Sequence, residues 1–265
     1  MLISSLQNPR VKEAVALRER RAREQSGLML VEGYHELALA VRAQMVPTTV
    51  FCCLERIRPE ESELLEYFRS QRIPLLEVTA AVLGKLAYRE HPDAWLAIAP
   101  IPKRSLDELL LPPAALIVVA ESIEKPGNLG AILRSADAAG ADALILCDRA
   151  TDLFNPNVVR ASKGTIFRVP VVEATSAATL AFLRERKIFI AAATPAGTID
   201  YWDADLQQSV AIAVGTEKEG LSSLWLEGAE ARVTVPMCGA VNSLNVAQAL
   251  TLILFEARRQ RRMTP

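Results

Sequence analysis

Apolar runs and helical segments alternate along nearly the whole chain, and this alternation predicts the fold class. In the first hundred residues the strand-like apolar runs cover residues 28–31, 48–53, 75–78 and 94–99. Helical spacing of apolar positions covers residues 8–24, 33–43, 59–69 and 79–86. Short strands that alternate with helices are typical of an α/β layer, so we expect a small α/β domain here.

The second half of the chain alternates more regularly, and its predicted strands are apolar almost throughout. These strands cover residues 115–120, 143–147, 188–193, 210–214 and 232–236. Helices are predicted over residues 129–139, 176–187, 222–227 and 243–262, and Asn155-Pro156 opens a further short one. Because strands buried on both faces read as continuous apolar runs, the pattern predicts a mostly parallel sheet covered by helices on both faces.

A boundary between two domains is predicted at residues 100–104, which contain two prolines and after which the pattern restarts. We therefore expect one α/β domain over residues 1–103 and a second over residues 104–265.

Composition and charge limit the classes of protein to which this chain can belong. Of the 265 residues, 51% are hydrophobic, which is enough for well-packed cores, and the formal net charge is -1. Such a chain is not a globally basic nucleic-acid binder, so contact with a polyanion would depend on local patches. The first ten residues are polar, and no apolar run approaches the roughly 20 residues that span a bilayer. We expect no signal peptide, no membrane partner and a cytoplasmic location.

The cysteines and histidines give no sign of a metal site. The four Cys, at positions 52, 53, 147 and 238, lack CxxC spacing, and the chain has only two His. This disfavours both a zinc site and a disulfide framework, and no metal is predicted. All four Cys lie in or beside apolar runs, so we expect buried thiols in a reducing cytoplasm.

Three polar segments that contain glycine each follow an apolar strand, and the first leads through Gly127-Asn128 into a helix that carries Arg134. Asn128 is a candidate N-cap, and Arg134 lies off the apolar stripe of the helix. Open α/β sheets bind ligands at the carboxyl ends of their strands, so Arg134 is a candidate for contact with a phosphate or ribose. The alternative is a capping asparagine followed by a solvated surface arginine.

The second segment, residues 215–221, is a charged loop with glycines that would let a ligand approach the backbone, although a plain charged turn explains it too. In the third, Asn242, Ser243 and Asn245 precede the last helix. Ser243 is a candidate cap, and capping needs only one polar residue, so the two Asn are surplus to it. Neither of the first two loops has a Walker or GxGxxG spacing.

Two further segments have more than one explanation. Residues 155–164 carry Arg160, Ser162 and Lys163 in a short helix, which either contacts a ligand or is a solvated connector. The last helix is apolar on more than one side, so it is buried on more than one side. A dimer contact or packing within one chain would each explain that surface.

Taken in order, the three segments resemble the signature motifs of a known family. The motifs are Asn128-x-Gly130-x-x-x-Arg134, Gly215-x-Glu217-x-x-Gly220-Leu221, and Pro236-Met237 followed by Ser243-Leu244-Asn245-Val246. They resemble those of the SpoU (TrmH) family of S-adenosylmethionine-dependent RNA ribose 2′-O-methyltransferases, and Arg160-Ala161-Ser162-x-Gly164 is also similar to a family segment. The resemblance covers roughly residues 113 to 260. The N-terminal domain more loosely resembles the substrate-binding domain of many members, which itself resembles an RNA-binding ribosomal-protein fold.

The resemblance implies a deep trefoil knot in the C-terminal domain, with S-adenosylmethionine bound there as cofactor. It also implies a homodimer formed through this domain. The residues implied for the cofactor are Thr194, Gly215, Thr216, Glu217, Gly220, Val235, Pro236, Met237, Ser243, Leu244 and Val246.

The chemistry implied is methyl transfer to a ribose 2′-hydroxyl, and the catalytic candidates are Arg134, Asn128, Glu217, Ser243 and Asn245. The motifs contain no His, and the guanidinium of Arg134 is effectively always protonated. We therefore expect Arg134 to hold the target phosphate and the developing alkoxide, with the other four residues orienting it and the ribose. The RNA-binding candidates are Arg10, Lys12, Arg18, Arg21, Arg160 and Ser162.

We expect the RNA to be ribosomal, because members with an N-terminal substrate domain favour rRNA. A tRNA methyltransferase is the alternative within the same class. A non-catalytic RNA-binding factor with the same fold and a small-molecule methyltransferase without RNA affinity are the alternatives from other classes.

Overall fold

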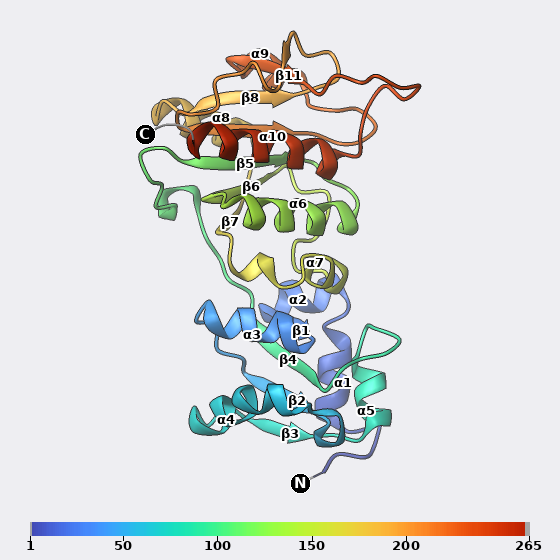
Figure 1. Cartoon of the computed structure of the whole chain (residues 1–265). Helices are drawn as coiled ribbons and strands as arrows, with labels where there is room; N and C mark the ends of the chain where they lie inside the picture. Colours follow the sequence, from blue (N-terminus) through green and yellow to red (C-terminus); the bar gives the residue numbers. More distant parts are fainter. Residues whose placement is uncertain (1, 263–265) are drawn as a thin grey trace. The chain divides into compact units, whose positions relative to one another are not determined.

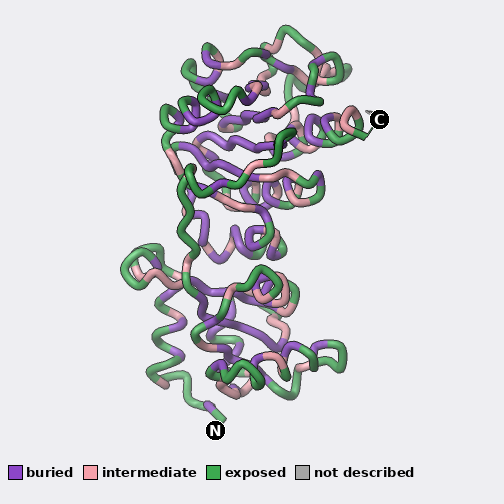
Figure 2. The backbone as a smooth tube through the Cα atoms, turned by 90° about the vertical axis from the view of Figure 1, so that its left-hand side faces the viewer, coloured by how far each residue is buried: buried purple, intermediate pink, exposed green. Residues whose placement is uncertain are grey.

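The computed structural model describes residues 2–262 and divides into two compact units (Figure 1). Unit 1 comprises Met1–Pro102 and Asp152–Arg168, and unit 2 comprises Lys103–Thr151 and Val169–Pro265. Unit 1 is therefore not continuous in sequence, since a segment from the middle of the chain completes it. In both units the strands are mostly buried and the outer helix surfaces are exposed (Figure 2).

Unit 1 is built on a mixed four-stranded sheet with strand order β1-β4-β2-β3. The strands are β1 (Leu28–Glu32), β2 (Thr49–Cys52), β3 (Leu75–Glu77) and β4 (Trp95–Pro100). Strand β4 pairs antiparallel with β1 and β2, whereas β2 and β3 are parallel. The helices are α1 (Pro9–Ala16), α2 (Arg20–Ser26), α3 (Tyr34–Arg42), α4 (Ser62–Ser70), α5 (Ala80–Leu86) and α7 (Pro156–Ala161). Short 3-10 turns are η1 (Leu54–Arg56), η2 (Pro59–Glu61) and η4 (Thr165–Phe167).

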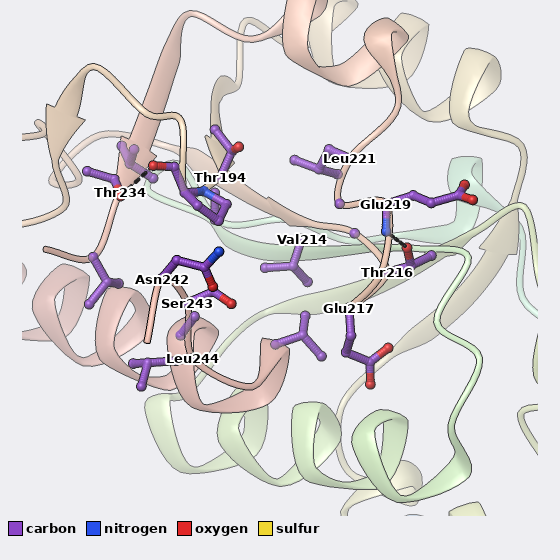
Figure 3. Close-up of a pocket in the computed structure, with 18 of the residues that line it drawn as sticks. Thr194, Val214, Thr216, Glu217, Glu219, Leu221, Thr234, Asn242, Ser243 and Leu244 are labelled. Atoms are coloured by element: carbon purple, nitrogen blue, oxygen red, sulfur yellow. Dashed lines mark hydrogen bonds between the residues drawn. The ribbon is translucent and has the colours of Figure 1, made fainter. Parts of the chain in front are cut away.

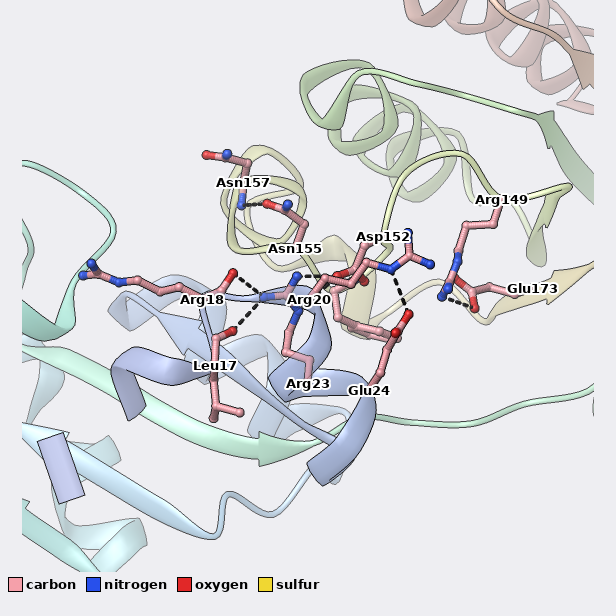
Figure 4. A network of polar contacts seen from close by, with 11 residues as sticks. Leu17, Arg18, Arg20, Arg23, Glu24, Arg149, Asp152, Asn155, Asn157 and Glu173 are labelled. Carbon is pink, nitrogen blue, oxygen red and sulfur yellow. Dashed lines mark hydrogen bonds and ion pairs between the residues drawn. The ribbon is translucent and has the colours of Figure 1, made fainter. Parts of the chain in front are cut away.

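The prediction of one basic helix over residues 8–24 was wrong, because the chain forms α1 and α2 with a break between them. Arg23 explains the break. It is 1% exposed, and its Nη1 donates to the carbonyls of Leu17 and Arg18 at 2.7 and 2.6 Å (Figure 4). Its guanidinium also forms an ion pair with Asp152, with Nε to Oδ2 at 3.0 Å. Arg23 is thus a buried structural cation, and only part of this basic segment faces solvent.

The segment Asp152–Arg168 packs closely against β1 and α3 of unit 1. Gly164 has a φ of +82°, and a Cβ there would lie 2.9 Å from the Cα of Glu36. Glycine is therefore required for both the backbone conformation and the close approach. Ser162 is fully buried, and its Oγ donates to the carbonyl of Val159 at 2.7 Å.

Unit 2 contains a seven-stranded sheet with strand order β7-β6-β5-β10-β8-β11-β9, and every neighbouring pair is parallel. The strands are β5 (Leu116–Glu121), β6 (Ala143–Cys147), β7 (Val171–Ala174), β8 (Phe189–Ala193), β9 (Ile199–Asp200), β10 (Val210–Val214) and β11 (Ala231–Thr234). The sequence pattern missed β7, which carries a Glu, and β9, which has two residues. Both are edge strands.

Helices cover both faces of this sheet. They are α6 (Pro126–Ala139), α8 (Ser176–Glu185), α9 (Ser223–Gly228) and α10 (Val246–Arg262), with a 3-10 turn η3 (Leu106–Glu108) before β5. Leu183 of α8 and Trp225 of α9 pack with Ile117 and Val119 of β5 on one face, and α6 and α10 pack together over the other. The α/β fold class with a large parallel sheet is thereby confirmed, and the trefoil knot stays a prediction.

Two predicted helix caps differ from the structure. Helix α6 begins at Pro126 after Lys125, so Asn128 lies in its first turn and does not cap it. Helix α10 begins at Val246, and Asn245 caps it, because the Oδ1 of Asn245 accepts from the Ala247 N–H at 3.0 Å. Ser243 is consequently not the cap. Gly140 ends α6 with a φ of +67°, the left-handed conformation that glycine commonly adopts directly after a helix.

The cysteines also differ from the prediction. Cys52, Cys53 and Cys147 are buried, but Cys238 is exposed in the loop before α10. No helix within residues 2–262 is both long enough and apolar enough to cross a bilayer.

Candidate functional site

A cavity of about 400 Å³ lies in unit 2 at the carboxyl ends of β8, β10 and β11, which are neighbours in the sheet (Figure 3). Open parallel sheets bind ligands at this edge. The loops that follow the three strands form its walls, and the first turns of α10 close it with Val246, Ala249 and Ile253. Figure 3 shows Asn242 and Ser243 on one side of the cavity and Glu217 on the other.

The loop after β10 is folded back on itself. The Thr216 N–H donates to the Gly220 carbonyl at 3.1 Å, and the Gly220 N–H donates to the Thr216 carbonyl at 3.0 Å. The Thr216 Oγ1 accepts from the Glu219 N–H at 2.9 Å. A Cβ at Gly215 would lie 2.1 Å from the Gly220 carbonyl oxygen, so this turn requires glycine at Gly215. The carboxylate of Glu217 is left exposed at the mouth of the cavity.

The loop after β11 has backbone polar groups that form no hydrogen bonds within the described part of the chain. Over residues 235–244, no backbone N–H or C=O forms a hydrogen bond with another described residue. Val235, Met237, Asn242, Ser243 and Leu244 of this loop line the cavity. Backbone groups at a pocket wall supply both donors and acceptors, so the loop can hold a ligand that has polar edges.

A second polar group joins the starts of α6 and α10. The Nδ2 of Asn245 donates to the Oδ1 of Asn128 at 3.2 Å. The Nδ2 of Asn128 is buried and has no hydrogen-bond partner among the described residues. Further along α6, the hydroxyls of Ser135 and Thr251 are 2.6 Å apart and tie the two helices together. A buried donor without a partner is uncommon in proteins, which makes the Asn128 amide a candidate for contact with a substrate.

Arg134 lies on α6 with an exposed side chain, and no other described residue forms a hydrogen bond or ion pair with it. The structure thus brings Asn128 and Asn245 together, and it brings Glu217 and Ser243 to the cavity. Arg134 forms no hydrogen bond or ion pair with either group among residues 2–262.

The predicted cofactor residues gather at one place. All of them except Pro236 line the cavity, namely Thr194, Gly215, Thr216, Glu217, Gly220, Val235, Met237, Ser243, Leu244 and Val246. The sequence did not single out the apolar wall, to which Leu226, Ala249 and Ile253 contribute. Apolar residues on strands and helices carry no pattern that separates a pocket wall from a core.

Glu121 is a site residue that sequence reasoning missed. It ends β5 and is 6% exposed, and its Oε2 accepts from the Ser222 N–H at 2.8 Å, directly after the loop that begins at Gly215. Its Oε1 accepts from the Ser176 hydroxyl at 3.3 Å, and the Ser176 Oγ accepts from Trp225 Nε1 at 2.9 Å. A buried carboxylate is costly unless hydrogen-bonded, and here it fixes one end of the cavity loop. The acidic end of an otherwise apolar strand was the available signal.

Cys147, which ends the neighbouring strand β6, is chemically inert. Burial raises its pKa to about 12, with smaller contributions from the nearby carboxylates, although the Thr179 hydroxyl 3.3 Å away opposes the shift. A thiol with this pKa is neutral at physiological pH and is not a nucleophile.

The predicted RNA-binding residues lie in unit 1 and differ in their availability. Arg10, Lys12 and Arg21 are exposed on α1 and α2. Arg18 is half-buried, and its Nη2 donates to the carbonyls of Lys85, at 2.8 Å, and Ala87. Arg160 is exposed on α7, whereas the buried Ser162 cannot reach a ligand in this structure.

Comparison with known proteins finds one family model in each half of the chain. The SpoU rRNA Methylase family matches residues 115–255, and the MRM3-like substrate binding domain matches residues 8–97. The 23S rRNA (uridine(2479)-2′-O)-methyltransferase of Streptomyces viridochromogenes is 33% identical over 255 residues, which cover 92% of this chain and 87% of that protein.

Solved structures are similar over nearly the full length. The crystal structure of an RNA 2′-O ribose methyltransferase has 41% sequence identity and a TM-score of 0.88, covering 99% of this chain and 100% of that one. The SpoU methyltransferase AviRb from Streptomyces viridochromogenes, solved in complex with the cofactor AdoMet (S-adenosylmethionine), has 31% identity and a TM-score of 0.89, covering 98% and 100%. Together with the motifs gathered around one cavity, these matches establish that the chain belongs to the SpoU rRNA methylase family.

Proposed function

We propose that this protein transfers a methyl group from S-adenosylmethionine to a ribose 2′-hydroxyl of ribosomal RNA. The observation that carries the proposal is the cavity at the ends of β8, β10 and β11, which collects residues of the second and third family motifs. Similar proteins with this fold are named as rRNA 2′-O-methyltransferases or bind AdoMet.

The cavity suits S-adenosylmethionine. Its volume of about 400 Å³ is in the range of small-molecule pockets. Its apolar wall can cover a purine ring, and the unpaired backbone of residues 235–244 offers donors and acceptors to polar edges. The cofactor supplies an electrophilic methyl group on a sulfonium, so this chain's residues need to position the acceptor and promote loss of its proton.

We assign the positioning of the acceptor ribose to four residues. Asn128 and Asn245 form a hydrogen-bonded pair, and the spare Nδ2 donor of Asn128 is directed to the ribose or its phosphate. Ser243 and Glu217 act from the cavity side, where Glu217 accepts a hydrogen bond from a hydroxyl and Ser243 can donate or accept. Holding reactants in line can supply about 7–11 kcal/mol of a barrier without any covalent intermediate.

Arg134 supplies the charge in this proposal. Its guanidinium makes paired hydrogen bonds to the target phosphate and stabilises the negative charge that develops on the 2′-oxygen. It does not remove the proton, because a guanidinium stays protonated in proteins. The free side chain on α6 supports this role.

Unit 1 is proposed to bind the RNA. The exposed cations Arg10, Lys12, Arg21 and Arg160 are available to phosphates, and Arg18 adds charge while it also holds the end of α5. The domain that this unit matches is described as a substrate binding domain.

We further propose a homodimer that forms through unit 2, a trefoil knot in that unit and a cytoplasmic location. Leu252 and Phe255 support the dimer, because they are exposed apolar side chains on the outer surface of α10, 39% and 49% exposed. An apolar surface on an otherwise well-packed helix marks a site of association.

The test is methyl transfer from radiolabelled S-adenosylmethionine to separate pools of unmodified rRNA and tRNA, followed by digestion to nucleosides. We expect label in one 2′-O-methylated nucleoside from the rRNA pool. Label in nucleosides from the tRNA pool alone would identify tRNA as the substrate in place of rRNA. If folded protein binds S-adenosylmethionine but labels neither pool, it is a non-catalytic RNA-binding factor.

A further inference from the structure

A polar surface of unit 1 consists of Tyr88, Asn157 and Arg160. Tyr88 follows α5, and Asn157 and Arg160 lie on α7. The Nδ2 of Asn157 donates to the Tyr88 hydroxyl at 3.1 Å, and Nη2 of Arg160 donates to the Asn157 Oδ1 at 3.3 Å. One amide thus links an aromatic ring to a cation, and we call these three residues the Tyr88 surface.

Chemistry fixes the orientation of the linking amide. A guanidinium can only donate hydrogen bonds, so the oxygen of Asn157 has to face Arg160 and its nitrogen has to face Tyr88. The Tyr88 oxygen then accepts, and its own proton stays free to donate. The α7 backbone is fixed as well, because the Asn157 N–H donates to the Asn155 Oδ1 at 2.9 Å (Figure 4).

The backbone of Tyr88 is held from inside the unit. The N–H groups of Tyr88 and Arg89 donate to the two carboxylate oxygens of the buried Glu32 at 2.7 and 3.1 Å. Arg18 holds the preceding carbonyls of Lys85 and Ala87. The Tyr88 side chain is nevertheless 44% exposed. A rigid ring loses little conformational entropy when a flat partner stacks on it.

One cation at this surface is free to bind an anion. Arg160 forms no ion pair with another described residue. The carboxylates of Glu32 and Glu36 are occupied, by backbone N–H groups and by Arg89 respectively. Lys85 and Glu90, which are close to Tyr88 in the chain, are both exposed and opposite in charge. The guanidinium of Arg160 therefore carries the attraction to an anionic partner.

We propose that Tyr88 stacks on an unpaired base of the RNA substrate while Arg160 contacts an adjacent phosphate. The proposal rests on the proposed function and names single-stranded RNA as the feature that unit 1 recognises. Bases in loops and bulges can turn their faces to an aromatic side chain, whereas bases in a duplex are already stacked on each other. The free Tyr88 proton can add a hydrogen bond to the base or the sugar.

The test compares full-length Tyr88→Leu and Tyr88→Phe with the wild type. We measure affinity for a short single-stranded oligouridine and for its duplex with oligoadenosine, and KM for unmodified rRNA. Tyr88→Leu should bind the single strand roughly 5- to 100-fold more weakly, because stacking on the ring is lost. It should raise KM for rRNA while kcat and affinity for S-adenosylmethionine change little, and Tyr88→Phe should stay within about 3-fold of the wild type in each measurement.

Two controls separate stacking from charge and from folding. Tyr67→Leu removes a half-buried ring from α4 of the same unit and should leave RNA affinity unchanged. Arg160→Gln should weaken binding of single strand and duplex alike and flatten the dependence of affinity on salt.

The proposal is overturned if Tyr88→Leu binds the single strand as well as the wild type does. It is also overturned if that variant weakens single-strand and duplex binding equally, or if the wild type shows no preference for the single strand. Failure of the proposed function looks different, because then the wild type itself transfers no methyl group to RNA.

Discussion

At the scale of single residues, Arg134 is the catalytic candidate that carries a positive charge on an exposed side chain. It projects from α6 without a partner among the described residues, so its charge is not neutralised within the chain. We predict that Arg134→Ala lowers kcat by about 10²- to 10³-fold, the usual loss when a donor to a developing oxyanion is removed. Binding of S-adenosylmethionine, measured by calorimetry, should stay within error of the wild type.

Arg184→Lys is the matched control, since Arg184 is also an exposed arginine on a helix of unit 2. It should leave kcat unchanged. If folded Arg134→Ala retains nearly full turnover, the central role assigned to this residue is wrong.

The buried thiols predict a dependence of stability on alkaline pH. Burial raises the pKa of Cys147 to about 12 and, with help from Glu77, that of Cys52 to about 11, both from 9.0. A raised pKa in the folded state means that the stabilisation is complete below about pH 9 and is lost as pH rises towards the folded value. Between about pH 8 and pH 10, the wild type should lose about 1.4 kcal/mol more unfolding free energy than Cys147→Ala.

Urea denaturation of both proteins at the two pH values measures this difference, and subtraction removes the effect of other titrating groups. Equal losses in the two proteins would show that the Cys147 thiol ionises as readily in the folded state as in the unfolded one.

At the scale of elements, the loop after β10 depends on Gly215. A Cβ there would lie 2.1 Å from the Gly220 oxygen and 2.5 Å from the Leu221 nitrogen, and backbone atoms cannot give way without moving the loop. We predict that Gly215→Ala weakens binding of S-adenosylmethionine by at least about 10-fold and costs about 1–3 kcal/mol of unfolding free energy.

Gly239→Ala is the matched control in the neighbouring loop, because a Cβ at Gly239 would meet nothing within 4 Å. It should match the wild type in cofactor affinity. If both variants bind S-adenosylmethionine equally well in isothermal titration, the conformation of the loop after β10 does not determine cofactor affinity.

The link between Glu121 and Ser222 predicts a coupling between the sheet and the same loop. Glu121→Gln keeps the shape of the side chain but replaces one acceptor oxygen with a donor. Since the Ser222 N–H and the Ser176 hydroxyl both donate to Glu121, one of them should lose its partner, at a cost of about 1–3 kcal/mol in unfolding free energy. Affinity for S-adenosylmethionine should fall with it.

The comparison variant for Glu121 is Glu173→Gln on β7, where the carboxylate is paired with Arg149 and is half-exposed. Ion pairs at the surface contribute about 0–1 kcal/mol to the free energy of unfolding, so Glu173→Gln should lose no more than that. If chemical denaturation shows the same loss of unfolding free energy in both variants, Glu121 has no special role in holding the loop.

Most elements could be predicted from the sequence, and the exceptions share a physical cause. The strands β5, β6, β8 and β10 are buried on both faces, so their continuous apolar runs identify them. Strands β7 and β9 lie at the edges of the sheet, where burial on one side leaves a weaker pattern. The break between α1 and α2 depends on Arg23 and Asp152, which are distant in sequence, and no local pattern encodes that pair.

Many residues that line the cavity could be singled out from the sequence, because they lie in strand-end loops with glycines and polar residues in fixed order. The sequence could not predict that Asn245 caps α10 and bonds to Asn128, since both depend on how two helices meet. Ser162 was assigned to RNA because its segment is similar to one of the family, and burial of that side chain depends on packing within unit 1.

At the scale of the whole molecule, α10 predicts the state of association. Phe255 is 49% exposed beside Leu252, and we expect Phe255→Glu to dissociate a dimer into single chains of 28.9 kDa. Analytical ultracentrifugation measures the mass directly. Leu224→Glu, at an exposed apolar residue on α9, should leave the dimer intact. A wild type that sediments as a single chain would exclude the proposed dimer.

Unit 1 depends on the segment Asp152–Arg168, which comes from the middle of the chain. Without it, Arg23 would keep a buried charge but lose Asp152, and such a broken pair costs about 3–5 kcal/mol. A gene fragment that ends at residue 102 therefore does not encode a complete unit 1. A single crossover at residue 102 would join a foreign N-terminal segment to the resident Asp152–Arg168 segment, so the partner of Arg23 would have to match across that junction.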